Sequence, residues 1–317
     1  MLPAREELDL GPRLPADAGW RERLRVERRS RMLVPAAVAV AYVRRRAAWR
    51  WARDEELRKA SRRRIEAVVA GTSRAGAVEH LARAAALEDA AAVELLRRHR
   101  RLCEGRRRQG EAHLRDARRT ARGVLVSYCH LGPFQGASSA VLATLGRAPW
   151  LFVGTWLDQP PGVGLSGRHV ERWRELQRRA GARCVTTVPG DTLTRGVELL
   201  RRGEVACFLF DVRGSTDTMW LGKPVALATG TARMAHAADA LVVPMVCSRR
   251  RGTVTSRFLR AVDPRDFPSP DALHRRLADV HGDAILADPA AFEDPYRLGA
   301  WETGAGPSRW SNPAKGA

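Results

Sequence analysis

The second part of the chain alternates between short apolar segments and helical patterns, and this alternation restricts the fold more than any other feature. Apolar, β-branched segments with the length of buried strands lie at 124–128, 150–155, 183–188, 205–211, 241–248 and 253–262. Helical patterns lie between them at 134–145, 167–180, 192–202 and 231–238. Such alternation through short connections predicts an α/β domain with a mixed, mainly parallel sheet flanked by helices. The last two strands predict an antiparallel hairpin about residues 249–252.

The first part of the chain has a different composition, rich in Ala, Arg, Leu and Glu with few β-branched runs. This composition predicts helices throughout residues 21–122, with breaks near Gly71-Thr72-Ser73 and Cys103-Glu104-Gly105. We therefore expect a flexible arm over 1–20, an Arg-rich helical region over 21–122, an α/β domain over 123–303 and a disordered tail over 304–317.

The formal net charge is +20, and arginine carries nearly all of it because lysine occurs only at positions 59, 223 and 315. Either the protein has an anionic partner or the bias reflects a GC-rich genome, and the sequence leaves both interpretations open. Aromatic residues make up 6% of the chain, do not interleave with the arginines, and accompany no nucleic-acid motif. We therefore expect no nucleic-acid partner.

Several common chemistries lack their sequence signals. The five cysteines are scattered without a CxxC pair, and the eight histidines form no HxxxH pattern, so we expect reduced thiols and no metal. The GxGxxG, Walker A and GxSxG motifs are also absent, which argues against dinucleotide, nucleotide triphosphate and α/β-hydrolase chemistry.

The most apolar segment of the first part is residues 32–43, and it contains Pro35. As a helix, it would cover about 18 Å of the roughly 30 Å that a membrane span needs. Arginines flank it on both sides, and Trp49 and Trp51 follow it. This pattern predicts a helix that lies at an anionic membrane surface, although an ordinary buried helix hairpin would have the same composition.

The most informative motif is His130-Leu131-Gly132-Pro133-Phe134-Gln135, which follows the strand at 124–128 directly. Proline suits the first helical turn, so His130 should lie on a tight turn at the carboxyl end of a strand, where α/β proteins bind ligands. Gln135 should lie in the next helical turn and face the imidazole. Such a histidine can act as a general base; the alternative is a core histidine bonded to a backbone carbonyl.

Two further segments have polar residues where a ligand could bind. Asp211 and Arg213 follow the strand at 205–211 and should face the same way, which allows them to bind a polar group jointly or to form a plain surface ion pair. Gly230 and Thr231 open a helix that also carries Arg233. The start of that helix could bind an anion, or it could be an ordinary capping turn.

The order and spacing of these three segments resemble the lysophospholipid acyltransferase superfamily, over about residues 33–301. The most similar branch looks like the lipid A late acyltransferases and the actinobacterial phosphatidylinositol mannoside acyltransferases. Family members have Asp or Glu where this chain has Gln135. The departure leaves three outcomes: a slower enzyme, an enzyme that uses the carboxylate of Asp211 or Glu171, or a protein that has lost catalysis.

The resemblance implies a function at the cytoplasmic face of the membrane. The reaction would transfer a fatty acyl group from acyl-CoA or acyl carrier protein to a lipid or glycolipid acceptor. His130 would be the general base, and Gln135 would hold its tautomer. Asp211, Arg213 and Arg233 would bind the acceptor, and backbone N–H groups near Gly132 or at Gly230 and Thr231 would stabilise the oxyanion. No cofactor is implied, and the oligomeric state stays open. The alternative is a non-catalytic member that binds acyl carrier protein or anionic lipid.

Overall fold

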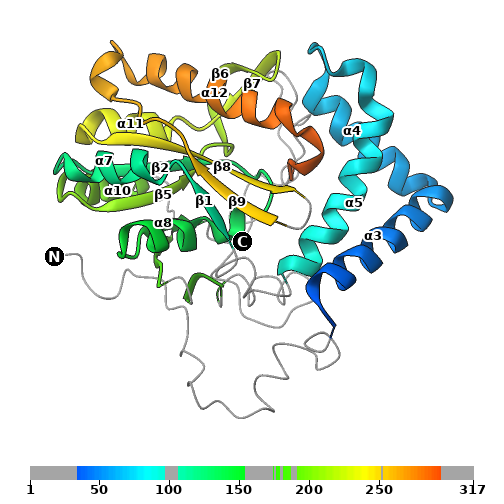
Figure 1. Cartoon of the computed structure of the whole chain (residues 1–317). Helices are drawn as coiled ribbons and strands as arrows, with labels where there is room; N and C mark the ends of the chain where they lie inside the picture. The colour runs from blue at the N-terminus through cyan, green and yellow to red at the C-terminus, as the bar shows by residue number, and fades with distance from the viewer. Residues whose placement is uncertain are drawn as a thin grey trace, which may run out of the picture.

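The computed structural model describes residues 34–96, 106–153, 174, 176–178, 181–186, 191–250 and 253–293. These residues form a sheet with helices on both faces, a separate two-stranded hairpin and a group of N-terminal helices at one end of the sheet (Figure 1). The arm predicted over 1–20 and the tail predicted over 304–317 lie outside the described residues.

The sheet has seven strands in the order β1-β9-β8-β2-β5-β3-β4. Their bounds are Arg107–Gln109 (β1), Val124–Tyr128 (β2), Trp150–Val153 (β3), Arg183–Thr186 (β4), Val205–Leu209 (β5), Leu241–Arg250 (β8) and Thr253–Phe258 (β9). The strands from β8 to β4 are all parallel, whereas β9 is antiparallel to β8 and β1 is parallel to β9. The prediction of a mixed, mainly parallel sheet is confirmed.

Alternation along the central strand β2 places its side chains on two separate cores. Leu125 belongs to the core under α10 (Thr192–Arg201), α11 (Gly230–Ala238) and α12 (Pro270–Ala287). Val124 and Val126 belong to the core under α7 (Glu111–Arg119) and α8 (Ala137–Leu145). Helices therefore cover both faces of the sheet.

Strands were predicted well in their apolar middles and less well at their ends. The β2 strand has the predicted bounds, and the predicted hairpin is present, with Met245 opposite Phe258 and Arg250 opposite Thr253. The structure describes only residues 174 and 176–178 of the helix predicted at 167–180, and these are helical.

The hairpin of β6 (Arg213–Trp220) and β7 (Lys223–Leu227) was not predicted from the sequence. Its first strand is mostly polar, so it lacks the apolar signal of a buried strand. The turn depends on Leu221 and Gly222, which both have positive φ, at 53° and 79°. Two successive residues of positive φ match the twist of a two-residue hairpin turn, and Leu221 is an unusual residue for that position.

The N-terminal part contains α3 (Ala36–Arg53), α4 (Glu55–Val69) and α5 (Val78–Leu96). Asp54 ends α3 and caps α4 by accepting a hydrogen bond from the backbone N–H of Leu57. The chain breaks after α4 at the predicted Gly71-Thr72-Ser73. The prediction of helices throughout residues 21–122 is wrong at β1, which lies inside this region.

Ion pairs join the N-terminal helices to one another and to the sheet. Arg44 of α3 donates to Glu88 of α5 at 2.7 Å, and Arg249 of β8 donates to the same carboxylate. Arg64 of α4 donates to both oxygens of Asp89 at 3.1 and 2.9 Å. Part of the arginine excess therefore holds elements together.

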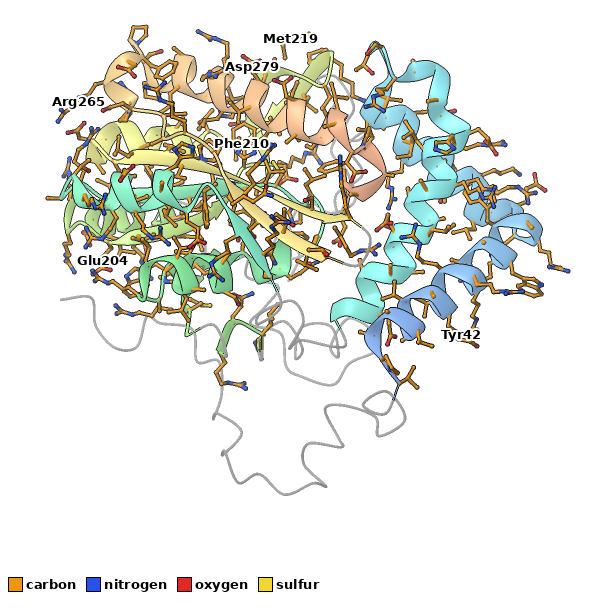
Figure 2. The ribbon with its side chains drawn as sticks, viewed as in Figure 1. Tyr42, Glu204, Phe210, Met219, Arg265 and Asp279 are labelled. Carbon is orange, nitrogen blue, oxygen red and sulfur yellow. The ribbon has the colours of Figure 1, made fainter. Side chains whose placement is uncertain are left out.

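One face of α3 packs inward and the other is exposed. Among the described helices, none is long and apolar enough to cross a membrane. Trp51 is buried, so only Trp49 of the two predicted interfacial tryptophans is exposed. Val38, Tyr42 and Trp49 are 55%, 65% and 57% exposed, and Tyr42 lies on the outer side of the helix (Figure 2).

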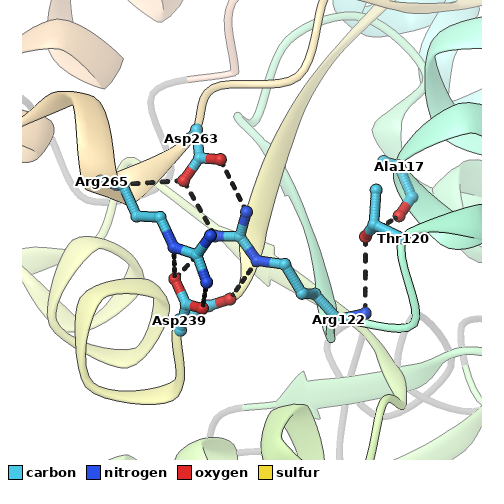
Figure 3. A network of polar contacts seen from close by, with 6 residues as sticks. All are labelled: Ala117, Thr120, Arg122, Asp239, Asp263 and Arg265. Atoms are coloured by element: carbon cyan, nitrogen blue, oxygen red, sulfur yellow. Dashed lines mark hydrogen bonds and ion pairs between the residues drawn. The ribbon is translucent and has the colours of Figure 1, made fainter.

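A polar network fixes the start of β2. Arg122 donates to both carboxylate oxygens of Asp263, at 2.6 and 2.8 Å, and to the backbone and side chain of Asp239. Arg265 donates to Asp239 from the other side (Figure 3). Charge-assisted bonds of this kind hold the pKa of Asp263 down at about 2. The network ties β2 to the end of α11 and to the segment before α12.

Candidate functional site

The site is built where two neighbouring parallel strands end at the same edge of the sheet. Tyr128, the last residue of β2, lies opposite Leu209, the last residue of β5. Two residues beyond each come His130 and Asp211, so the strand register itself brings the two side chains together. A carboxyl edge of parallel strands is the usual ligand position in such sheets.

His130 and Asp211 form a buried hydrogen-bonded pair. The Nδ1 atom of His130 lies 3.0 Å from Oδ1 of Asp211, and the backbone N–H of His130 donates to Oδ2 at 2.8 Å. The residues are 7% and 1% exposed. Because the carboxylate can only accept, it selects the tautomer with hydrogen on Nδ1 and leaves the lone pair on Nε2. This arrangement equips the imidazole as a base and stabilises it once protonated.

The turn after His130 has little conformational freedom. Gly132 has φ of 59°, and a Cβ added there would lie 2.6 Å from the carbonyl oxygen of Cys247. Buried Arg106 donates to the carbonyl of Pro133 at 2.9 Å and also bonds Ser256 and Cys247. The Phe134 ring packs edge-on against the imidazole, with centroids 4.7 Å apart. These contacts fix the direction of the His130 ring.

Gln135 has a different role from the one expected. It lies in the 3-10 turn Phe134–Gly136, and its side-chain amide donates to Glu293, at 3.2 Å to Oε1 and 3.4 Å to Oε2. Its backbone carbonyl accepts from Gln177 at 2.8 Å. The structure therefore places Asp211, and not Gln135, at Nδ1 of His130. Glu171, the other carboxylate considered, lies outside the described residues.

Glu293 is a site residue that the sequence analysis missed. Its backbone N–H donates to the carbonyl of His130 at 2.7 Å, next to a bridge between Leu131 and Phe292. Burial raises the pKa of its carboxyl to about 7, against the opposing effects of the His130 charge and the Gln135 hydrogen bond. The residue is 158 positions from Gln135 and follows no motif, so no sequence signal would have found it.

The remaining predicted residues lie in three environments. Arg213 begins β6 and is partly exposed, two residues from Asp211. Gly230 opens α11 as expected, Thr231 is buried, and Arg233 is exposed on the same helix. The N–H of Gly132 donates to the carbonyl of Ala291 at 2.8 Å, so it is already committed and does not suit an oxyanion.

Two buried histidines pack against Phe210, the residue before Asp211. The rings of His274 and His281 lie on Phe210, with centroid distances of 5.1 and 4.9 Å. His281 bonds Ser127 at 2.9 Å and His274 bonds Thr218 at 3.0 Å. Burial lowers the pKa of His274 to about 4 and that of His281 to about 3. Both rings are therefore neutral at pH 7.

Neither the Cys129 thiol nor a metal cluster is arranged for chemistry in the described part of the chain. Burial holds the pKa of Cys129, the neighbour of His130, well above its ordinary value, so its thiol is a poor nucleophile. Within the described ranges, no group of three or more His, Cys, Asp or Glu side chains is placed to bind a metal ion.

The chain is far from known proteins in sequence. No family model matches it, and no curated protein matches it. Among solved structures, it is similar to the 1-acyl-sn-glycerophosphate (LPA) acyltransferase PlsC from Thermotoga maritima, with a TM-score of 0.39 and 16% identity. That match covers 65% of this chain and 83% of the other. At this TM-score the similarity decides nothing about the chemistry, which must be argued from the geometry of the site.

Proposed function

We propose that the protein is an acyltransferase that moves a fatty acyl group from acyl-CoA or acyl carrier protein to a hydroxyl or amine of a lipid or glycolipid acceptor. The observation that carries this proposal is the His130–Asp211 pair at the carboxyl ends of β2 and β5. The order of the motifs along the chain, which resembles the lysophospholipid acyltransferases, supports the choice of acyl transfer over other base-catalysed reactions.

His130 would act through its Nε2 atom. As the acceptor oxygen or nitrogen attacks the thioester carbonyl, Nε2 takes its proton and the carbonyl becomes a tetrahedral oxyanion. The carboxylate of Asp211 stabilises the imidazolium that forms. When the carbon–sulfur bond breaks, the sulfur leaves as a thiol with the proton that His130 returns. General-base catalysis of this kind contributes about 10²- to 10⁴-fold in rate.

The acceptor and the oxyanion would be bound by groups near this pair. Arg213 is partly exposed and close in sequence to Asp211, which suits a contact with a phosphate or sugar of the acceptor. Arg233 is a weaker candidate on α11. The backbone N–H groups at Gly230 and Thr231, at the start of that helix, are candidates for the oxyanion.

The outer face of α3 supports a peripheral position at a membrane surface; the cytoplasmic face is part of the proposal and follows only from the family resemblance. Val38, Tyr42 and Trp49 recur on this face together with the exposed arginines Arg45 and Arg53. The guanidinium of Arg53 lies 4.3 Å from the centre of the Trp49 ring. Aromatic residues and arginines on one helix face suit the headgroup region of an anionic membrane.

The test is release of the thiol from long-chain acyl-CoA, with and without added lysophospholipid. The wild-type protein should release thiol slowly without acceptor and faster with it, and His130→Ala should abolish both reactions. The matched control is His113→Ala, at an exposed histidine on α7, which should keep full activity. Retained thiol release in His130→Ala would overturn the mechanism.

A second function is favoured by the neutral side chain at position 135. A protein without a carboxylate there could bind acyl carrier protein or anionic lipid without turning it over. The same assay decides, because this alternative expects no thiol release by the wild-type protein, with or without acceptor.

A further inference from the structure

We infer that Glu293 is a positioning residue of this site. It bonds the Gln135 side chain and the His130 backbone, and it supplies the negative charge that Gln135 lacks. The inference rests on the proposed function for its kinetic consequence. The electrostatic coupling between the Glu293 carboxylate and the His130 ring can be tested without turnover.

Two bonds attach Glu293 to the site. Its backbone N–H donates to the carbonyl of His130, and its carboxylate accepts from the amide of Gln135. The residue thus touches both ends of the motif that begins at His130. Gln135 is 8% exposed, and a buried amide that donates to a carboxylate is oriented by it. Loss of the carboxylate charge would weaken that orientation and the field at His130.

The charges around Glu293 come from several elements. His130 on the β2 turn lowers the pKa of the Glu293 carboxyl and so attracts its ionised form, as does the Gln135 hydrogen bond. Asp89 of α5 opposes ionisation, and Arg64 of α4, bonded to Asp89, favours it. Burial is the largest influence and raises the pKa to about 7. Glu293 is therefore poised to change its charge within the working range of an enzyme.

The attraction between Glu293 and His130 acts when His130 is protonated. A proton on His130 is what the proposed reaction creates as the acceptor attacks. The ionised carboxylate therefore stabilises the transition state more than the resting state, and only above the pH at which Glu293 ionises. A neutral residue at position 293 would lose this effect, even if it kept the hydrogen bond to Gln135.

The first experiment compares turnover of long-chain acyl-CoA by the wild type and Glu293→Gln across pH. The amide keeps an acceptor for Gln135 and removes the charge. The two proteins should have similar kcat at pH 6, and the variant should be about three- to tenfold slower at pH 8.5, because the loss of a nearby charge changes the protonation equilibrium of a histidine by roughly this factor.

The control is Glu204→Gln, at a partly buried glutamate paired with Arg147, which should match the wild type at both pH values. Equal kcat at every pH, or a loss that does not vary with pH, would overturn the inference.

The second experiment exchanges the two side chains. Gln135→Glu alone places two carboxyls at the distance of the present hydrogen bond, where they repel and one must take up a proton. This single variant should lose activity, whereas Gln135→Glu combined with Glu293→Gln restores one amide and one carboxylate and should recover it. If the double variant shows the two single losses multiplied together, the residues do not act as a pair and the inference fails.

The third experiment separates this inference from the proposed function. In a proton NMR titration, the His130 ring signal, identified by its loss from His130→Gln, should titrate at lower pH in Glu293→Gln than in the wild type. If the two titrations differ in this way but the wild-type protein does not turn over acyl-CoA, the coupling is supported and the proposed acyltransferase is contradicted. An unchanged His130 titration would contradict the coupling whatever the activity.

Discussion

Gly132 shows how one residue fixes the direction of the His130 side chain. Its positive φ alone could be tolerated at a cost, but its Cα also faces the carbonyl of Cys247 with no room for a side chain. The turn after β2 must therefore pass close to the backbone of β8 at Cys247. Any residue with a Cβ at this position would move His130 away from Asp211.

We expect Gly132→Ala to lose both stability and acyl transfer. Gly146→Ala is the matched control, because Gly146 has a similar φ of 67° and open space around it. The control should lose about 1 kcal/mol of unfolding free energy from its backbone conformation alone and should keep its activity. Gly132→Ala should lose more, measured by urea unfolding, together with most of its thiol release. Equal losses in the two variants would show that the contact with Cys247 does not matter.

Part of the site was open to prediction at the scale of single residues. His130 and Asp211 each follow an apolar strand, so a parallel sheet brings them to one edge once the two strands are neighbours. The sequence does not state that β2 and β5 are neighbours, and the nearer Gln135 was therefore expected at Nδ1. Glu293 could not be found, because its contact with Gln135 depends on how the chain returns after α12.

At the scale of elements, apolar segments were predicted correctly and polar strands were not. The β2 strand is buried along its whole length, is apolar at every position except Ser127, and was predicted residue for residue. The β6 strand begins with Arg213-Gly214-Ser215-Thr216-Asp217, which carries no alternation of apolar and polar residues. Its pairing with β7 comes from a turn that Leu221 adopts against its own preference. Tertiary context, and not local propensity, decides such an element.

The exposed face of α3 is expected to bind the membrane. We expect the double variant Tyr42→Ser, Trp49→Ser to bind vesicles containing anionic phospholipid at least about tenfold more weakly, because two aromatic side chains lose their contact with the bilayer. The measurement is co-sedimentation with vesicles at low salt. Met219→Ser is the control, since Met219 is 65% exposed on β6 and lies on another element. Equal weakening by the control would mean that α3 is not the binding surface.

At the scale of the whole molecule, the two buried histidines that pack on Phe210 make stability depend on pH. Both have a lowered pKa in the folded protein, about 4 for His274 and about 3 for His281, against 6.5 for an ordinary histidine. The unfolded chain therefore binds more protons below pH 6.5. Stability should be constant with respect to these groups above pH 6.5 and should fall as the pH drops from 6.5 towards 3.

We expect His281→Gln to flatten that dependence, because the glutamine cannot take up a proton in the unfolded chain. The free energy of unfolding should be measured in urea at several pH values between 4 and 7. The variant should be less stable than the wild type at pH 7, where it loses packing against Phe210, and the difference should shrink towards pH 4. A constant difference would show that His281 does not contribute to the acid sensitivity.

The proposed reaction requires His130 and Asp211 to act as one unit on a thioester. The most direct test is the rate of acyl-CoA turnover for His130→Ala, Asp211→Asn and the double variant, each checked for folding by circular dichroism. When two residues act as a unit, the enzyme loses most of its activity at the first substitution. The double variant should therefore be no slower than the slower single variant. Full turnover in Asp211→Asn, or a double variant slowed by the product of the two single losses, would contradict the dyad.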